Sequence, residues 1–330
     1  MNTIHYLSGP HVNVEKGYWL YDQLVKDGYN IKSYYLYRYG HSRDFSTRIH
    51  RYTRSLKLLL LSKKNDLVLL YDVTSVFILL GLFIKLFHMD RRVVAVNFMG
   101  SGCKEGYDRW KRPLISMGLR KIQRIGVNNE MLIDLYSRQL NIDRSQFFVI
   151  KDCAANVDVE PRDCSIQEPP YVFMGGNVHR DWTMFKEIVK EMPTIHFVAV
   201  LSGNDLDEAK DLPNLKVYKK IPLDDFNALV AHCKIVLLPL TTEIQGGQLV
   251  AFQGSMYKKP VIISNCISID TYYTDFDVIK VKIGDKDACK SAILKLYSDN
   301  DLCESMGKKG YGRIFQLTPE TIYNKIKAQF

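Results

Sequence analysis

The sequence predicts two doubly wound α/β domains of similar size. Short apolar runs alternate with stretches of helical periodicity, a pattern typical of parallel sheets with helices on both faces. The alternation stops once, at a polar segment with three prolines over 159–170, and then starts again. A length of 330 residues also favours two cores over one. We therefore expect an N-terminal domain over 1–158, a linker over 159–170 and a C-terminal domain over 171–330.

The first domain is expected to form a sheet from its short apolar runs. These strands lie at 3–9, 30–38, 66–72, 92–99, 124–129 and 147–152. Helical periodicity covers the intervening segments, most clearly 44–64 and 130–140. The longest apolar stretch, Val76–Ile84, has nine residues, far fewer than the ~20 that a transmembrane helix needs. It predicts a helix buried against the sheet.

The second domain repeats this pattern. Its expected strands lie at 171–176, 196–203, 215–221, 234–240, 260–264 and 278–283. Helices are expected over 181–191, 223–233, 248–257 and 285–330, and the last helix could pack back on the N-terminal domain. Two such Rossmann-like domains would face each other across a cleft.

The cysteines and the N-terminus suggest a cytoplasmic protein. Seven cysteines are scattered along the chain without a CxxC pair, which argues against a disulfide framework and a structural zinc site. The N-terminal residues show no basic region followed by an apolar run, so no secretory signal is expected. The Asp-Leu-Asp at 205–207 could imitate a metal-binding Asp-x-Asp, but a polar loop is the simpler interpretation, and we expect neither metal nor cofactor.

A pair of glycines marks the end of the expected strand 234–240. Gly246 and Gly247 lack a Cβ, so the backbone there can turn tightly and approach a ligand closely. The following segment predicts a helix, whose first N–H groups, at Gln248 and Leu249, would favour an anion such as a diphosphate. The alternative is an ordinary helix start that binds no ligand.

The wider stretch "QGGQLVAFQGSMYKKPVI", from Gln245 to Ile262, resembles the donor-site motif of the GT-B glycosyltransferases of family 4. In that family a Glu, seven residues and a second Glu precede a Lys-Pro-Val, which is present here as Lys259-Pro260-Val261. Gln245 and Gln253 occupy the two Glu positions. The resemblance implies that Gln253 binds the donor ribose, through an amide oxygen that accepts without charge assistance. The loss of that assistance is worth about 1–2 kcal/mol.

A second stretch, "YVFMGGNVHRDWTMF" over 171–185, is similar to the family's first strand and turn in the donor domain. The resemblance implies that Gly175 and Gly176 approach the donor diphosphate and that Arg180 binds it with its planar guanidinium. The alternative for Arg180 is an ion pair with Asp181 or another acid. Asp181 itself is expected to cap the following helix.

The resemblance implies a hexosyltransferase-type enzyme. It would move a sugar from a nucleotide diphosphate, with UDP expected, to a lipid-linked or growing saccharide in cell-surface polysaccharide synthesis. A retaining, metal-independent reaction is implied by the family alone. The catalytic residue is unknown, with His11, Asn97 and Gln245 as candidates. The alternative is a nucleotide-sugar or glycan-binding protein whose catalytic site has decayed, because both motif glutamates are replaced.

Positive charge is concentrated in the N-terminal half. Residues 1–158 carry 24 Lys and Arg against 14 Asp and Glu, whereas residues 159–330 carry 21 against 22. Two basic segments contribute to this charge. Their cationic residues are Arg48, Arg51, Arg54, Arg109, Lys111, Arg112, Arg120, Lys121 and Arg124. Such segments suit an anionic bilayer and predict peripheral binding at the inner face of the cell membrane. The alternatives are solvated helix faces and, without a recognisable module, nucleic acid, which we do not expect.

Overall fold

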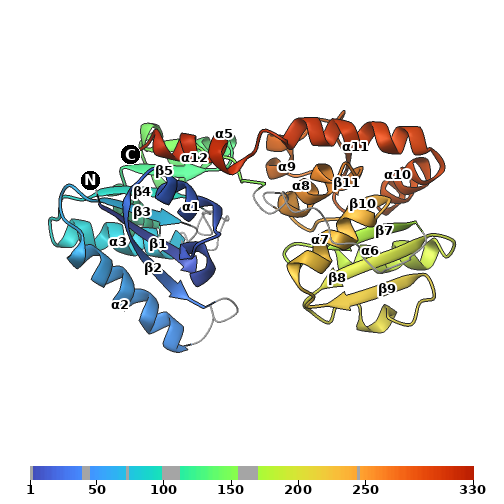
Figure 1. Cartoon of the computed structure of the whole chain (residues 1–330), viewed down its shortest axis with the longest axis horizontal. Coiled ribbons are helices and arrows are strands. Elements are labelled where there is room, and N and C mark those ends of the chain that lie inside the picture. The colour runs from blue at the N-terminus through green and yellow to red at the C-terminus, as the bar shows by residue number, and fades with distance from the viewer. Residues whose placement is uncertain (1–2, 39–44, 72–73, 99–111, 155–169, 244–245) are drawn as a thin grey trace. The chain divides into compact units, whose positions relative to one another are not determined.

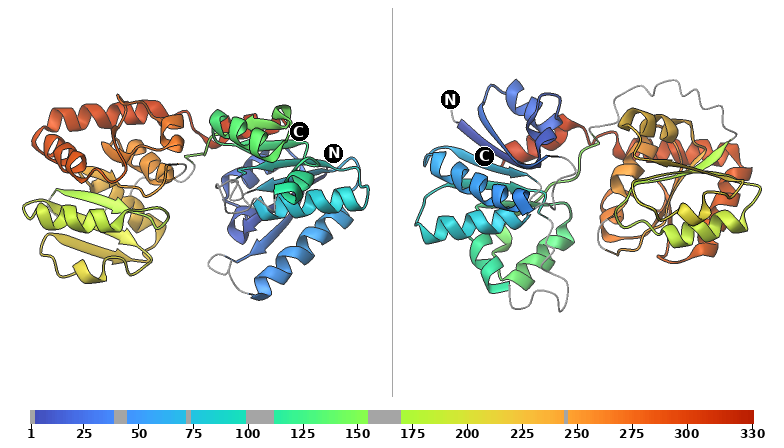
Figure 2. Two further views of the ribbon diagram at one scale, coloured as in Figure 1. Left: turned by 180° about the vertical axis from the view of Figure 1, so that it is seen from behind. Right: turned by 90° about the horizontal axis from the view of Figure 1, so that it is seen from below.

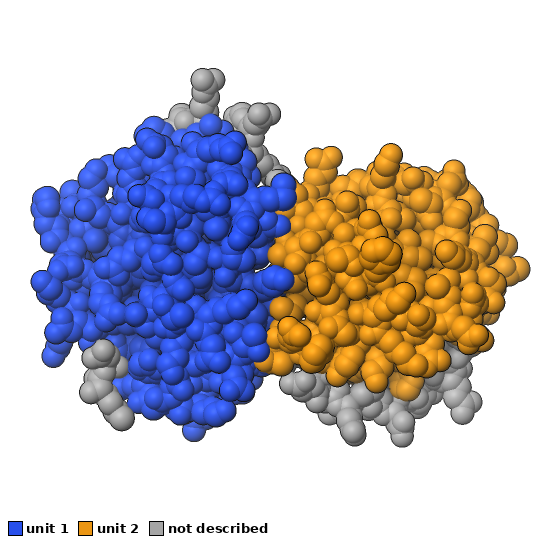
Figure 3. Space-filling model, turned by 90° about the horizontal axis from the view of Figure 1, so that it is seen from above, with its two compact units in different colours: residues 1–153, 319–330 blue, residues 154–318 orange. Residues whose placement is uncertain are grey.

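The structure is a computed structural model of the whole chain (Figure 1). It describes residues 3–38, 45–71, 74–98, 112–154, 170–243 and 246–330. The chain forms two compact units (Figure 3): residues 1–153 with 319–330 make unit 1, and residues 154–318 make unit 2. Apart from Pro170, the expected linker over 159–170 lies outside the described residues.

Unit 1 is built on a parallel six-stranded sheet in the order β2-β1-β3-β4-β5-β6. The strands are β1 (Thr3–Pro10), β2 (Asn30–Tyr37), β3 (Leu67–Tyr71), β4 (Arg92–Val96), β5 (Arg124–Val127) and β6 (Phe147–Val149). The central strands are nearly continuous apolar runs because both of their faces are covered.

Helices cover both faces of this sheet (Figure 2). One layer consists of α2 (Phe45–Leu61), α3 (Thr74–Leu86), α4 (Arg112–Leu119) and α5 (Glu130–Leu140), which pack on the sheet in one continuous core. The other layer consists of α1 (Trp19–Lys26) and α12 (Pro319–Lys327). Short 3-10 turns, η1 (His11–Val14) and η3 (Arg144–Gln146), follow β1 and precede β6.

The last helix is held on unit 1 by polar contacts. Tyr323 and Lys327 of α12 both reach Asp27 at the end of α1, and the Lys327 Nζ to Asp27 Oδ2 distance is 2.7 Å. Arg124 donates from Nε to Gln329 Oε1 at 2.7 Å. Sequence positions about 300 residues apart are thereby joined in one unit.

Unit 2 repeats the architecture with the sheet order β12-β11-β10-β7-β8-β9. Its strands are β7 (Tyr171–Gly175), β8 (His196–Leu201), β9 (Leu215–Lys219), β10 (Ile235–Leu238), β11 (Val261–Ser264) and β12 (Ile279–Val281). Its helices are α6 (Trp182–Glu191), α7 (Leu223–His232), α8 (Gln248–Met256), α9 (Ile267–Tyr272), α10 (Lys286–Ser298) and α11 (Asn300–Ile314), with a 3-10 turn η4 (Asp207–Ala209).

Successive residues of the central strands β7, β8, β10 and β11 pack in opposite cores. Val172 and Met174 of β7 pack with α6 and α10, whereas Tyr171 and Phe173 pack with α7, α8 and α9. This is the period of two that a fully covered strand requires. The expected α/β class with two doubly wound sheets is therefore confirmed.

Candidate functional site

The strand order places a topological switch point in unit 2 between β7 and β10. From β7 the chain continues to β8 on one side, whereas β10 leads to β11 on the other side. In open α/β sheets, ligands bind beyond the carboxyl ends of the strands at such a point. The turn after β7 and the loop after β10 are hydrogen-bonded to each other there. Asp181 N donates to Pro239 O at 2.9 Å, and Thr241 N donates to His179 O at 3.1 Å.

Arg180 lies in the turn after β7 and has no acidic partner among the residues that the structure describes. Its Nε donates to Gly175 O at 2.8 Å and its Nη1 to Val178 O at 3.0 Å. Burial lowers the pKa of its guanidinium to about 10, so the group remains protonated at neutral pH. The alternative pairing with Asp181 is not observed, because Asp181 caps α6 by accepting from Met184 N at 2.9 Å.

Gly176 makes room for this guanidinium. Its φ of +103° is one that side chains rarely adopt, and a Cβ at this position would lie 2.7 Å from Arg180 Nη2. Gly175 is constrained differently, since a Cβ there would lie 2.7 Å from the ring of Phe226 and 2.8 Å from that of Phe173. The two adjacent glycines are thus required for different reasons. Gly176 accommodates the guanidinium, and Gly175 accommodates the aromatic rings packed against it.

The second glycine pair forms the turn that leads into α8. Gly246 N donates to Ser268 Oγ at 3.3 Å, and Gly247 has a φ of +78° at the N-cap position. A Cβ at Gly246 would come within 3.5 Å of His179 Cβ. The start of α8 therefore lies beside the turn that holds Arg180.

The N-cap residue of α8, Gly247, has no side chain with which to cap the helix. Three other helices of unit 2 are capped by carboxylates, namely α6 by Asp181, α10 by Asp285 and α11 by Asp299. The first residue of α8, Gln248, is buried, and the second, Leu249, is 59% exposed. The first turn of α8 contains no acidic residue, and it adjoins Arg180, which has no acidic partner among the described residues; this arrangement favours an anion.

Gln253 is buried in the middle of α8 and faces α7. Its Nε2 donates to Asn227 Oδ1 at 2.8 Å, and both side chains are less than a tenth exposed. The neighbouring residue on α7, Phe226, packs against Gly175. Consecutive residues of α7 thus connect Gln253 with the turn that holds Arg180.

Asn227 and His179 were missed in the sequence. Asn227 is polar but lies among apolar residues on the buried side of α7, and this departure from amphipathic periodicity is the signal that could have found it. His179 adopts a φ of +57°, which nothing in its sequence context indicates.

The catalytic candidates of unit 1 lie near the carboxyl ends of its strands. His11 follows β1, with Nε2 3.7 Å from Glu15 Oε1 and its ring edge-on to that of Tyr35. Asn97 follows β4 with a φ of +63° and lines a small cavity together with Trp19 of α1. Gln245, the third candidate, lies outside the described residues.

Two arginines of α2, Arg51 and Arg54, stack on tyrosines of β2. Arg54 lies over the ring of Tyr35 at 4.3 Å, and Arg51 lies over that of Tyr37 at 6.0 Å. Binding of this basic segment to an anionic bilayer stays a prediction. The exposed residues of α2 include an apolar stripe of Phe45, Ile49, Tyr52 and Leu60.

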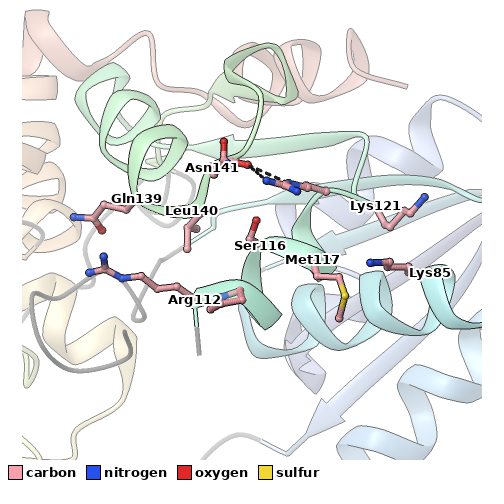
Figure 4. A pocket seen from close by; sticks show the side chains of 10 residues that line it. Lys85, Arg112, Ser116, Met117, Lys121, Gln139, Leu140 and Asn141 are labelled. Atoms are coloured by element: carbon pink, nitrogen blue, oxygen red, sulfur yellow. Dashed lines mark hydrogen bonds between the residues drawn. The ribbon is translucent and has the colours of Figure 1, made fainter. Parts of the chain in front are cut away.

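The second basic segment lines a groove of about 680 Å³ between α3, α4 and α5 (Figure 4). Arg120 caps α5 by donating from Nε and Nη2 to Asn141 O at 3.0 and 2.6 Å. Lys85 lies in the last turn of α3. Cations at helix C-termini stabilise the helix dipoles, so this groove has a structural explanation. Arg109 and Lys111 lie outside the described residues.

Elsewhere in unit 2, the Asp-Leu-Asp at 205–207 forms part of a polar loop. Asp207 bonds with Lys219. Within the described ranges, no helix is long and apolar enough to cross a membrane.

Comparison with known proteins finds similarity only to solved structures. No protein-family model matches the sequence, and no curated protein matches it. Among solved structures, sucrose-phosphate synthase of Thermosynechococcus elongatus has a TM-score of 0.78 at 12% identity and covers 99% of this chain and 98% of its own. HepE of Anabaena, solved with UDP and with UDP-glucose, has a TM-score of 0.73 at 10% identity, covering 99% of each chain. A glycosyltransferase of Rickettsia africae has a TM-score of 0.70 at 11% identity, covering 99% of this chain and 98% of its own. The chain thus shares the GT-B fold of these proteins.

Proposed function

We propose that this chain is a glycosyltransferase that transfers a sugar from a nucleotide diphosphate to a saccharide acceptor. The observation that carries the proposal is the pairing, at the switch point of unit 2, of Arg180 with the uncapped N-terminus of α8. A diphosphate supplies the negative charge that would neutralise Arg180 and the positive end of the α8 dipole. The fold shared with HepE, which was solved with UDP-glucose, supports UDP as the nucleotide.

The donor would lie along the carboxyl ends of β7 and β10. Arg180 and the backbone of Gly176 would contact the diphosphate on one side, and Gly246, Gly247, Gln248 and Leu249 on the other. Gln253 would accept from the ribose hydroxyls. Arg180 and α8 supply positive charge at the leaving group, which is the basis for proposing a reaction independent of metal ions.

The acceptor is proposed to be a lipid-linked or growing saccharide of the cell surface. The positive charge of residues 1–158 supports an acceptor presented at an anionic membrane. The retaining outcome and the hexosyl donor rest on the family 4 resemblance over 171–265. His11, Asn97 and Gln245 remain the proposed catalytic candidates.

A second function is a binding protein that holds a nucleotide sugar or a glycan without turnover. The replacement of both motif glutamates by Gln245 and Gln253 favours it. In this case the site would bind the donor, but neither hydrolysis nor transfer would follow.

A turnover assay separates the two functions. The protein is incubated with a panel of UDP-, GDP- and dTDP-sugars, with and without oligosaccharide acceptors, and the released nucleotide is measured. Release from one donor that increases with acceptor supports the transferase. If the protein binds the donor but releases no more nucleotide than an Arg180→Ala variant does, the result would support the binding protein.

A further inference from the structure

One buried polar pair joins two helices of unit 2. Asn227 of α7 is 3% exposed and Gln253 of α8 is 8% exposed, and the Gln253 Nε2 donates to Asn227 Oδ1 at 2.8 Å. Buried side-chain amides are satisfied by hydrogen bonds. This one has a defined direction, because Gln253 is the donor.

The direction determines what the rest of the Gln253 amide offers. A glutamine amide has one donor group and one acceptor oxygen, on opposite sides of its terminal carbon. When Nε2 is engaged by Asn227, Oε1 is the atom left to interact elsewhere. An amide rotated by 180° would instead present two N–H donors.

We infer that Asn227 is a positioning residue that turns Gln253 Oε1 toward the donor ribose. The inference rests on the proposed function and adds a residue to it. A ribose hydroxyl can donate or accept, but the resembled family has a glutamate at this position, and only Oε1 can accept from the ribose as that carboxylate would. With the amide fixed in this way, a neutral glutamine presents an acceptor as a glutamate would.

The position of α7 fits this role. Phe226, next to Asn227, packs against Gly175 at the turn that holds Arg180. One helix thus sets both the cation turn and the amide. A shift of α7 would therefore disturb both, so the test separates the amide's orientation from the helix's position.

The test measures affinities for UDP, 2′-deoxy-UDP and 3′-deoxy-UDP by calorimetry. We expect the wild type to prefer UDP over at least one deoxy analogue by roughly tenfold, the effect of one well-formed hydrogen bond. Asn227→Asp should keep the preference, since a carboxylate still accepts from Nε2. Asn227→Leu should reduce it to about twofold or less, because the amide is then free to rotate.

A rescue variant distinguishes positioning from packing. A glutamate presents an oxygen in either rotamer, so adding Gln253→Glu to Asn227→Leu should restore the preference for UDP. Where Asn227→Leu does not fold, Asn227→Ala serves, because water can accept or donate and leaves the amide unfixed. Tyr273→Phe is the matched control, since it removes another buried bond of α8, between Tyr273 Oη and Ser255 Oγ at 3.0 Å. It should leave the preference unchanged.

The outcomes separate this inference from the proposed function. If folded Asn227→Leu binds UDP and keeps the wild-type preference for UDP over the deoxy analogues, only the positioning role is overturned. A wild type that binds UDP and both analogues equally overturns the ribose role of Gln253 and this inference, while the diphosphate site stands. A wild type that binds no UDP overturns both proposals.

Discussion

Arg180 is a cation held by carbonyl oxygens and not by an acid. Its bonds to Gly175 O and Val178 O orient the guanidinium without neutralising it, and Gly176 leaves the space it occupies. Burying a cation without a counter-charge costs free energy, and a bound anion would offset that cost. This is the physical reason for assigning it to a ligand.

Replacing Arg180 should therefore weaken nucleotide binding more than folding. We expect Arg180→Ala to lower the affinity for UDP by roughly tenfold or more, the effect of losing charge-assisted hydrogen bonds. Calorimetry and thermal unfolding measure the two effects. Arg313→Ala is the control, since Arg313 also donates to a carbonyl, Tyr272 O at 2.9 Å, but has Asp277 as partner. Equal UDP affinity in wild type and folded Arg180→Ala would exclude Arg180 from the site.

His5 is a second informative residue, although it concerns stability. It is fully buried, with Nε2 3.1 Å from Asp66 Oδ2 and Nδ1 3.3 Å from Tyr34 Oη. Burial lowers the pKa of His5 below its ordinary 6.5, and nearby Lys32 and Arg91 act in the same direction, while Asp66 opposes them. The fold thus favours neutral His5.

Stability should fall as the pH drops below about 6.5, since the unfolded chain then binds a proton that the folded chain resists. The slope from one such group is at most about 1.4 kcal/mol per pH unit. Chemical denaturation between pH 7.5 and 5.5, values chosen on either side of the ordinary histidine pKa, should show a smaller decline in His5→Phe than in wild type. His196→Phe, an exposed histidine, is the control. Parallel curves for His5→Phe and wild type would contradict the account.

Among the elements, α2 differs from an ordinary surface helix. Phe45, Ile49 and Tyr52 are spaced by four and three residues, so they share one side of the helix, and they are 77%, 52% and 55% exposed. The helix contains no acidic residue and three arginines. An apolar stripe within a basic element matches the interface of an anionic bilayer.

We expect Phe45→Ser with Ile49→Ser to reduce binding to phosphatidylglycerol-rich vesicles by roughly tenfold or more. The binding should also weaken with salt, since the Debye length falls from about 10 Å at 0.1 M to about 3 Å at 1 M. Phe276→Ser is the matched control, because Phe276 in unit 2 is 78% exposed. Vesicle binding unaffected by the double substitution would remove α2 from any membrane surface. Tighter binding to tRNA or duplex DNA would favour nucleic acid instead.

At the scale of the whole molecule, periodicity and breaker residues predicted most of the fold. Apolar runs bounded by turns identified the twelve strands of the described residues, because buried parallel strands are short, continuous and β-branched. The prediction that a ligand binds beyond the carboxyl end of the strand before Gly246 followed from the general rule for open α/β sheets. The short helix α9 was missed, since six residues carry too little periodicity.

The site was predicted less completely, for reasons of tertiary packing. The Gly246-Gly247 turn could be selected from local backbone chemistry, and Gly176 and Arg180 from the resemblance to family 4. The bond between Asn227 and Gln253 joins residues 26 apart on different helices, and no local pattern specifies such a pair. The stacking of Arg54 on Tyr35 likewise depends on how α2 packs against β2, and no local pattern specifies it.

The account's central claim is that unit 2 binds the diphosphate of a nucleotide. It is tested most directly by calorimetric titration of the wild-type protein with UDP and with uridine, which differ only in the diphosphate. We expect UDP to bind at least roughly a hundredfold more tightly than uridine, because Arg180 and the start of α8 would each add charge-assisted hydrogen bonds. Equal affinities for UDP and uridine, or no binding of UDP, would contradict the claim.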